Sequence, residues 1–121
     1  MLHGLYSVIQ FVPQPERGEA INVGLVLVSD NGKQVWTHFR KASSFSRYPY
    51  HLRPNPEALK SFEFNLKKHP QVAEIEEPLS FLSTLHHDLR NSVQASEPHA
   101  CAFADPKSFL DNLFRTIVVP P

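Results

Sequence analysis

The chain has 121 residues, of which 41% are hydrophobic, and its twelve basic side chains balance twelve acidic ones. This length fits a single domain spanning residues 1–121, and the apolar content is sufficient for one core, which excludes a disordered chain. The charge balance argues against a nucleic-acid partner, because nucleic-acid binders carry a basic excess or a basic patch. The single cysteine, Cys101, excludes an intramolecular disulfide and the Cys-x-x-Cys motifs of zinc and redox proteins.

The first residues lack the basic segment and apolar stretch of a secretory signal. No apolar run approaches the roughly 20 residues that span a bilayer. We therefore expect a cytoplasmic protein without a membrane partner.

Two strands are predicted near the start of the chain. Residues 5–12 are rich in β-branched and aromatic residues and are followed by Pro13, a pattern typical of a strand. Their apolar side chains point to both sides, so burial on both faces is expected. Residues 20–28 form a second apolar run, which predicts a central strand containing Asn22 and Gly24.

A β-hairpin is predicted for residues 20–40. The pair Asn31-Gly32 favours a type I′ turn, because both central positions of that turn need positive φ. Residues 34–40 alternate in character, which places successive side chains on opposite faces of a strand. One face holds Val35, Thr37 and Phe39, and the other holds Trp36, His38 and Arg40.

A helix is predicted to start at residues 55–57, Asn-Pro-Glu. Asn is a favoured N-cap, Pro suits the first helical position and an acidic residue suits the first turn. Leu59, Phe62 and Leu66 follow at helical spacing, and Pro70 is predicted to end the helix.

Two further helices and a short strand are predicted in the second half of the chain. Pro78 opens a helix whose leucines share one stripe up to Leu89, and residues 91–96 alternate like a strand. Asp105 and Pro106 then cap a last helix. The predicted core-facing residues of that helix are Phe109, Leu110, Leu113, Phe114 and Ile117.

The order of these elements predicts the fold class. Residues 99–104 fit either a strand or a loop. We expect an α+β fold in a single domain, with a mixed or antiparallel sheet of about four strands and about three helices packed on one face.

The first candidate binding segment contains Arg17, Glu19 and Asn22. Arg17 offers a planar fork for a carboxylate or a phosphate, and Glu19 is either a base or the partner of Arg17. Asn22 lies on a central strand, where its amide needs hydrogen-bond partners, and Gly24 permits a close approach to the backbone. The alternative is an Arg–Glu pair at a loop edge and an Asn that fixes a turn or bulge.

The second candidate segment contains Ser92, Gln94, Ser96 and His99. On a strand, the first three of these residues share one face. A polar face that ends in a His is a candidate binding surface. Ser96 and His99 have the chemistry of a nucleophile and a base, but no third group that would complete a catalytic arrangement is identifiable. The alternative is the solvent side of a strand with a capping His.

Other residues give weaker indications of chemistry. His86 and His87 point about 100° apart on a helix, so they do not readily grip one ion, and no metal or other cofactor is expected. The apolar neighbours of Cys101 favour an inert thiol. Basic and aromatic residues mix in the segment 39–53, either for phosphate and base contacts or simply as a packed loop.

Two blocks of the sequence are similar to a bacterial family. The first begins with Tyr-Ser-Val-Ile-Gln-Phe-Val-Pro and the second with Asn-Ser-Val-Gln-Ala-Ser-Glu-Pro-His. Together they resemble the two terminal signatures of the family catalogued as domain of unknown function 3037. The resemblance implies no particular activity, but members of that family are often encoded beside HipA-type kinases, which implies an accessory role. The similar residues are 6–13, 17–19, 21–27, 91–99, 105–106 and 113–118.

These observations support three hypotheses about function. The first is a non-enzymatic partner-binding module, with a HipA-like kinase of a stress or defence locus as a candidate partner. The second is a phosphate- or nucleic-acid-handling protein that uses Arg17, Glu19, Asn22 and His99. The third is a homo-oligomer that self-associates through the hairpin face holding Trp36.

Overall fold

The computed structural model describes residues 2–12, 20–32, 34–46, 48, 53–72 and 93–118. Its central feature is a five-stranded antiparallel sheet in the order β3-β2-β1-β4, with β5 also pairing with β1. The predicted α+β fold is therefore confirmed, and the sheet is antiparallel rather than mixed. The strands are β1 (Leu2–Phe11), β2 (Ile21–Ser29), β3 (Val35–Phe39), β4 (Val93–Ala95) and β5 (His99–Phe103).

Two α-helices lie within the described residues, α1 (Pro56–Val72) and α3 (Pro106–Leu113). The helix predicted from Pro78 to Leu89 lies outside the described residues, so the described part of the chain holds two helices rather than the three predicted. A short 3-10 helix, Ala42–Phe45, precedes α1, and a π-helical turn, Phe114–Val118, follows α3.

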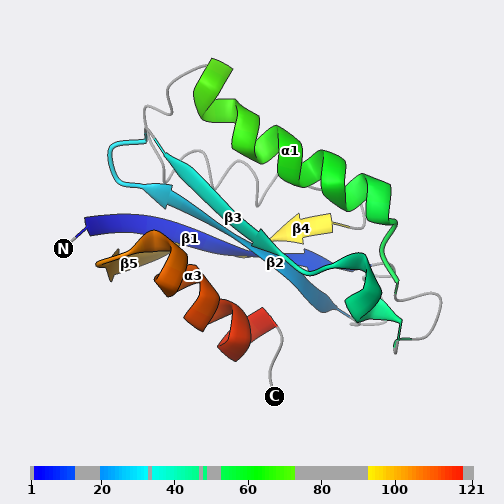
Figure 1. The fold of residues 1–121 in the computed structure, drawn as a ribbon. Helices are drawn as coiled ribbons and strands as arrows, with labels where there is room; N and C mark the ends of the chain where they lie inside the picture. Colours follow the sequence, from blue (N-terminus) through cyan, green and yellow to red (C-terminus); the bar gives the residue numbers. More distant parts are fainter. Residues whose placement is uncertain are drawn as a thin grey trace.

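The helices cover opposite faces of the sheet, so the prediction that they pack on one face is wrong (Figure 1). Val26 and Val28 share a core cluster with Leu59 and Leu66 of α1. Leu25 and Leu27, their neighbours on β2, share a second cluster with Leu110 of α3. The physical reason is that β2 is apolar on both faces, and each apolar face needs its own cover.

A bulge in β2 changes which side chains face which helix. Ile9 is opposite Gly24 but Gln10 is opposite Asn22, so Val23 is an additional residue in β2. Such an insertion shifts the alternation of the strand. As a result, Val23 joins the cluster of α1 on one side of the bulge, and Leu25 joins the cluster of α3 on the other side.

The hairpin between β2 and β3 is confirmed, but the predicted type I′ turn is wrong. Among the described residues, Gly32 alone has a positive φ, 74°, whereas a type I′ turn needs positive φ at two successive residues. The turn is wider: the Ser29 N–H donates to the Gln34 carbonyl at 3.0 Å, and the Gly32 N–H donates to the Ser29 carbonyl at 2.9 Å.

The predicted helix caps are confirmed. The Asn55 side chain accepts a hydrogen bond from the Glu57 N–H at 2.9 Å, and the Asp105 side chain accepts one from the Ser108 N–H at 3.1 Å. The predicted end of α1 is wrong, because the helix continues two residues beyond Pro70 to Val72. A proline near a helix end removes one N–H donor, whereas the residues after it keep theirs.

Neither described helix has the length and the apolar character that crossing a membrane requires.

Candidate functional site

The two polar segments predicted from the sequence flank the same strand, β1. Asn22 on β2 is opposite Gln10 on one side of β1, and Gln94 on β4 is opposite Gln10 on the other side. Neighbouring strands lie about 4.8 Å apart, so the backbones of Asn22 and Gln94 are separated by about 10 Å. The fold therefore brings one residue of each segment into a single row across three strands.

The amide of Asn22 has two hydrogen-bond partners within the chain. Its Oδ1 accepts a hydrogen bond from Gln10 Nε2 at 2.9 Å, and its Nδ2 donates to the Ile117 carbonyl at 3.0 Å. A half-buried amide needs such partners, because an unpaired one costs free energy. Asn22 thus joins β1, β2 and the π-helical turn beside the bulge. This agrees with the alternative in which Asn22 fixes a turn or a bulge.

Ser96 pairs with the backbone of β1. Its N–H donates to the Val8 carbonyl at 2.8 Å, and its Oγ accepts from the Val8 N–H at 2.8 Å. The hydroxyl itself donates to the Glu97 carbonyl at 3.2 Å rather than to His99. These bonds continue the sheet beyond β4, so Ser96 has a structural role.

His99 lies further along β1, opposite Tyr6. The two rings pack with their centroids 5.2 Å apart, and the Tyr6 ring also contacts Phe109. Tyr6 and Gln10 are separated by about 13 Å of extended strand, so His99 does not join the row formed by Asn22 and Gln94.

The remaining candidates from the sequence are Arg17, Glu19 and Ser92, and they lie outside the described residues, as do His86 and His87. For Gln94, the structure describes the pairing of its backbone with Gln10.

The close approach that Gly24 permits is made by a side chain of the protein itself. A Cβ atom at Gly24 would lie 2.7 to 2.9 Å from ring atoms of Phe39 on the neighbouring strand. No real Cβ comes that close to a neighbouring atom, so this glycine makes room for the Phe39 ring.

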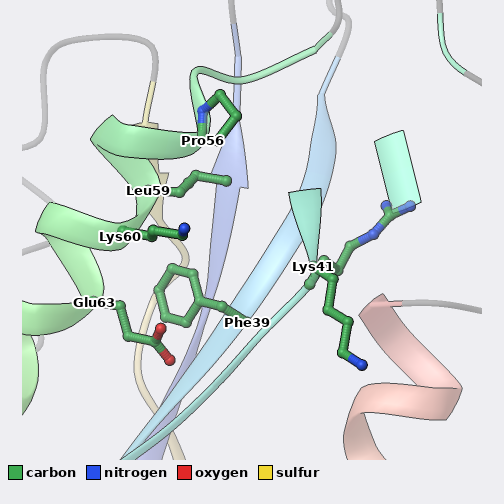
Figure 2. Close-up of a pocket in the computed structure, with 7 residues that line it drawn as sticks. Phe39, Lys41, Pro56, Leu59, Lys60 and Glu63 are labelled. Carbon is green, nitrogen blue, oxygen red and sulfur yellow. The ribbon is translucent and has the colours of Figure 1, made fainter. Parts of the chain in front are cut away.

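A hollow of about 220 Å³ lies between β3 and α1, and the sequence reasoning did not identify it. Phe39 and Leu59 contribute apolar surface to it, together with Pro56. Figure 2 shows the Phe39 ring beside Lys60 and Glu63 of α1, whereas the Lys41 side chain extends away from α1. The segments that meet here are 15 or more residues apart in sequence, so only the folded chain reveals the hollow.

The charges around this hollow are unequal. Three cationic side chains, Arg40, Lys41 and Lys60, line it together with one carboxylate, that of Glu63. The Glu63 Oε2 accepts a hydrogen bond from the Thr37 hydroxyl at 2.9 Å, which ties α1 to β3. Among the described residues, the rim of this hollow therefore carries an excess of positive charge.

Arg40 is the most strongly anchored of these cations. Its Nε donates to the Ser44 hydroxyl at 3.1 Å, and its terminal nitrogens donate to the Ser44 carbonyl and the Tyr48 hydroxyl. The guanidinium also lies over the Phe45 ring, 4.5 Å from its centroid. Arg40 therefore fixes the loop after β3, which favours the packed-loop interpretation of this basic and aromatic segment.

A second, wider hollow of about 880 Å³ adjoins the first, and the two share Pro56 and Lys60. Arg53 lines it, but its guanidinium donates to the Tyr48 and Ser46 carbonyls at 2.9 and 3.0 Å. The two hollows together form a continuous open surface along the first turns of α1.

The opposite side of β3 packs against α3 and the π-helical turn. The His38 ring stacks on Phe114 with centroids 3.9 Å apart, and its Nδ1 lies 3.1 Å from Asp111 Oδ1. Trp36 meets Phe103 edge to face at 5.9 Å. These side chains, expected as a self-association face, thus contact other parts of the same chain.

Cys101 is half-buried, and burial raises the pKa of its thiol above the ordinary value. A raised pKa keeps the thiol protonated and poorly nucleophilic, in agreement with the expected inert thiol. Within the described ranges, no three His, Cys, Asp or Glu side chains gather in a group able to hold a metal ion.

The described residues form an α+β protein whose sheet has an apolar core on each face and an open hollow beside its edge strand β3. The family model described as "Protein of unknown function (DUF3037)" matches residues 6–118, so the chain belongs to this family and the resemblance seen in the sequence is confirmed. Comparison with curated proteins gives no match, and comparison with solved structures gives none either.

Proposed function

We propose that the protein is a non-enzymatic module that binds a partner protein at the hollow between β3 and α1. One observation carries this proposal: an open surface with apolar and cationic side chains lies at the edge of the sheet. Protein-binding sites combine apolar anchors with a polar rim in this way.

The polar residues Asn22 and Ser96, which were candidates for a ligand site, form hydrogen bonds within the fold instead. Asn22 and Ser96 have hydrogen-bond partners in the backbone of this chain, so they serve the fold. The alternative of phosphate or nucleic-acid handling uses Arg17, Glu19, Asn22 and His99. Arg17 and Glu19 lie outside the described residues, and the register along β1 separates Asn22 from His99. The hollow near Lys60 therefore remains the better-supported place for a ligand.

The candidate partner is a HipA-like kinase, because the family to which the chain belongs is often encoded beside such kinases. Because such a kinase is an intracellular partner, we propose that the protein functions in the cytoplasm. The positive rim around Lys41 and Lys60 supports a partner surface with an excess of carboxylates, since complementary charges speed and orient association.

Co-purification tests this proposal. The tagged chain is expressed with the proteins encoded beside its gene, and a stoichiometric partner is expected to remain bound. The variant Lys60→Glu reverses a charge in the hollow and should weaken the complex by about tenfold or more. The matched control is Lys107→Glu, which makes the same exposed substitution on α3, on the opposite face of the sheet, and should bind like the wild type.

Recovery of the chain without a stoichiometric partner would overturn the proposal. Equal retention of a partner by the Lys60→Glu and Lys107→Glu variants would show that the hollow is not the docking place.

A further inference from the structure

β3 is an outer strand of the sheet, and β4 and β5 lie at the other edge. β3 pairs with β2, and the described residues provide no strand on its other side. Figure 1 shows β3 between α1 on one side and α3 on the other. An outer strand leaves a row of backbone donors and acceptors available for another strand.

The hydrogen bonds to β2 determine which residues of β3 offer those groups. The Arg40 N–H donates to the Val23 carbonyl at 2.9 Å, and the Gln34 carbonyl accepts from the Ser29 N–H at 3.0 Å. In an antiparallel pair, residues alternate between those bonded to the neighbour and those directed away from it. Even-numbered residues of β3 therefore bond to β2.

The odd-numbered residues Val35, Thr37 and Phe39 direct their N–H and C=O groups to the free edge. The same alternation places their side chains on the face that α1 covers, where Val35 and Phe39 pack against the α1 cluster. The hollow beside Phe39 thus lies next to the free backbone groups. An added strand would place every second side chain on that face, near Phe39 and Leu59.

The charges favour one kind of added strand. Three cations and one carboxylate line the hollow, and the carboxylate is already bonded to Thr37. A second copy of β3 would bring no carboxylate of its own, because the sequence Val35–Phe39 contains none. An acidic segment would instead place carboxylates near Lys60.

We propose that an acidic segment of a partner protein adds to the outer edge of β3 as an extended strand, with alternate apolar side chains directed to the hollow beside Phe39. This inference rests on the proposed function, and it specifies how the partner binds and what the bound segment is made of. Strand addition derives affinity from main-chain hydrogen bonds and specificity from pockets for alternate side chains.

The test uses synthetic peptides of about nine residues, a usual strand length, with blocked ends. One alternates Val with Glu, and the other alternates Val with Lys. Binding to the full chain is measured by amide hydrogen exchange and by NMR titration. The acidic peptide should slow exchange at the amides of Val35, Thr37 and Phe39, and the basic peptide should bind at least about tenfold more weakly.

Two variants at one position separate backbone pairing from side-chain effects. Thr37→Pro removes an N–H that points to the free edge, and an edge strand tolerates a proline at such a position. Thr37→Val keeps that N–H and removes the hydroxyl bonded to Glu63. We expect Thr37→Pro to weaken binding of the acidic peptide by about tenfold or more. The Thr37→Val variant should bind the same peptide with an affinity within about threefold of the wild type.

The results distinguish this inference from the proposed function. If the acidic peptide binds Thr37→Pro and the wild type equally, or leaves exchange at the three amides unchanged, strand addition is overturned, even where a partner still co-purifies through the hollow. If the basic peptide binds as tightly as the acidic one, the acidic chemistry is overturned. Should Thr37→Pro fail to fold, hydrogen exchange on the wild type still decides the outcome.

Discussion

On the side of β3 that faces α3, His38 stacks on Phe114 at 3.9 Å and lies 3.1 Å from a carboxylate oxygen of Asp111. On the side that faces α1, Phe39 meets Phe62 at the longer ring distance of 6.1 Å and borders an open hollow. One five-residue strand thus has a closely packed face and an open face.

The difference separates stability from binding within a single strand. The α3 face packs against aromatic rings and the Asp111 carboxylate of the same chain, so substitutions there should affect folding. The α1 face contributes apolar surface that the described residues leave uncovered, so substitutions at its rim should affect binding. The following substitutions test this division, starting with the largest expected change in stability.

Leu110→Ala should cause the largest loss of stability. Leu110 of α3 is 3% exposed, and truncating a buried leucine lowers the free energy of unfolding by about 2–5 kcal/mol. Leu59→Ala on α1 should lie near the lower end of that range, because the space it leaves opens onto the hollow rather than forming a closed cavity. Urea unfolding measures both values, and a larger loss for Leu59→Ala would contradict the comparison.

Gly24→Ala should be the next most destabilising change. The new Cβ would lie 2.7 Å from the nearest ring atom of Phe39, so the ring must move. Overpacking of this kind costs about 1–3 kcal/mol, and the hollow gives the displaced ring a place to go. Thermal unfolding measures the loss, and a drop in acidic-peptide binding should accompany it. An unchanged melting temperature would show that the contact is not tight.

Asn22→Ala should lower the free energy of unfolding by about 1–2 kcal/mol, because it leaves Gln10 and the Ile117 carbonyl without their bonds to the amide. Denaturant unfolding gives the magnitude. Partner binding at the hollow should be unaffected, since Asn22 does not line it. If Asn22→Ala abolished binding and left stability unchanged, the row across β1 would be the functional site instead.

Asp105 should give the smallest effect, confined to acidic pH. Hydrogen bonds from the Ser108 hydroxyl and N–H lower the pKa of the Asp105 carboxyl below its ordinary value of 3.8. The cap therefore contributes its full stability above about pH 4 and loses it as the pH falls through the lower pKa of the folded state.

Asp105→Asn provides the control for this titration. Asn is as good an N-cap as Asp but does not titrate in this range. Helical circular dichroism of the wild type should decline more steeply below about pH 4 than that of the variant. If the circular dichroism of the two proteins declines equally as the pH falls, the titration of Asp105 is not a source of acid sensitivity.

Much of the fold followed from local patterns. The strands, the hairpin and the caps at Asn55 and Asp105 depend on neighbouring residues, so the sequence predicts them well. The placement of both helices on one face was wrong, although the apolar residues on both sides of the first predicted strand already indicated two buried faces. The bulge at Val23 adds one residue to β2, and alternation read without it assigns the wrong face to part of that strand.

The candidate site was harder to predict than the fold. The polar residues that attracted attention, such as Asn22 and Ser96, serve the backbone of the sheet. The hollow combines Phe39 at the end of β3 with Leu59 and Lys60 on α1. Phe39 belongs only to the mixed basic and aromatic segment 39–53, and the other two belong to no catalytic or ligand-binding motif. Their association depends on how α1 crosses the sheet, which no local pattern encodes.

The free edge of β3 also imposes a condition on the protein when it is alone. An unpaired edge strand is a template for pairing with strands of other copies. Proteins limit this risk of aggregation with short edge strands and with lysines beside the edge. β3 is five residues long and is followed at once by Arg40 and Lys41, so its edge is short and ends in positive charge. The lysine that would attract an acidic partner thus also keeps identical molecules apart, and replacing Lys41 with a neutral residue should make the unpartnered protein prone to aggregate.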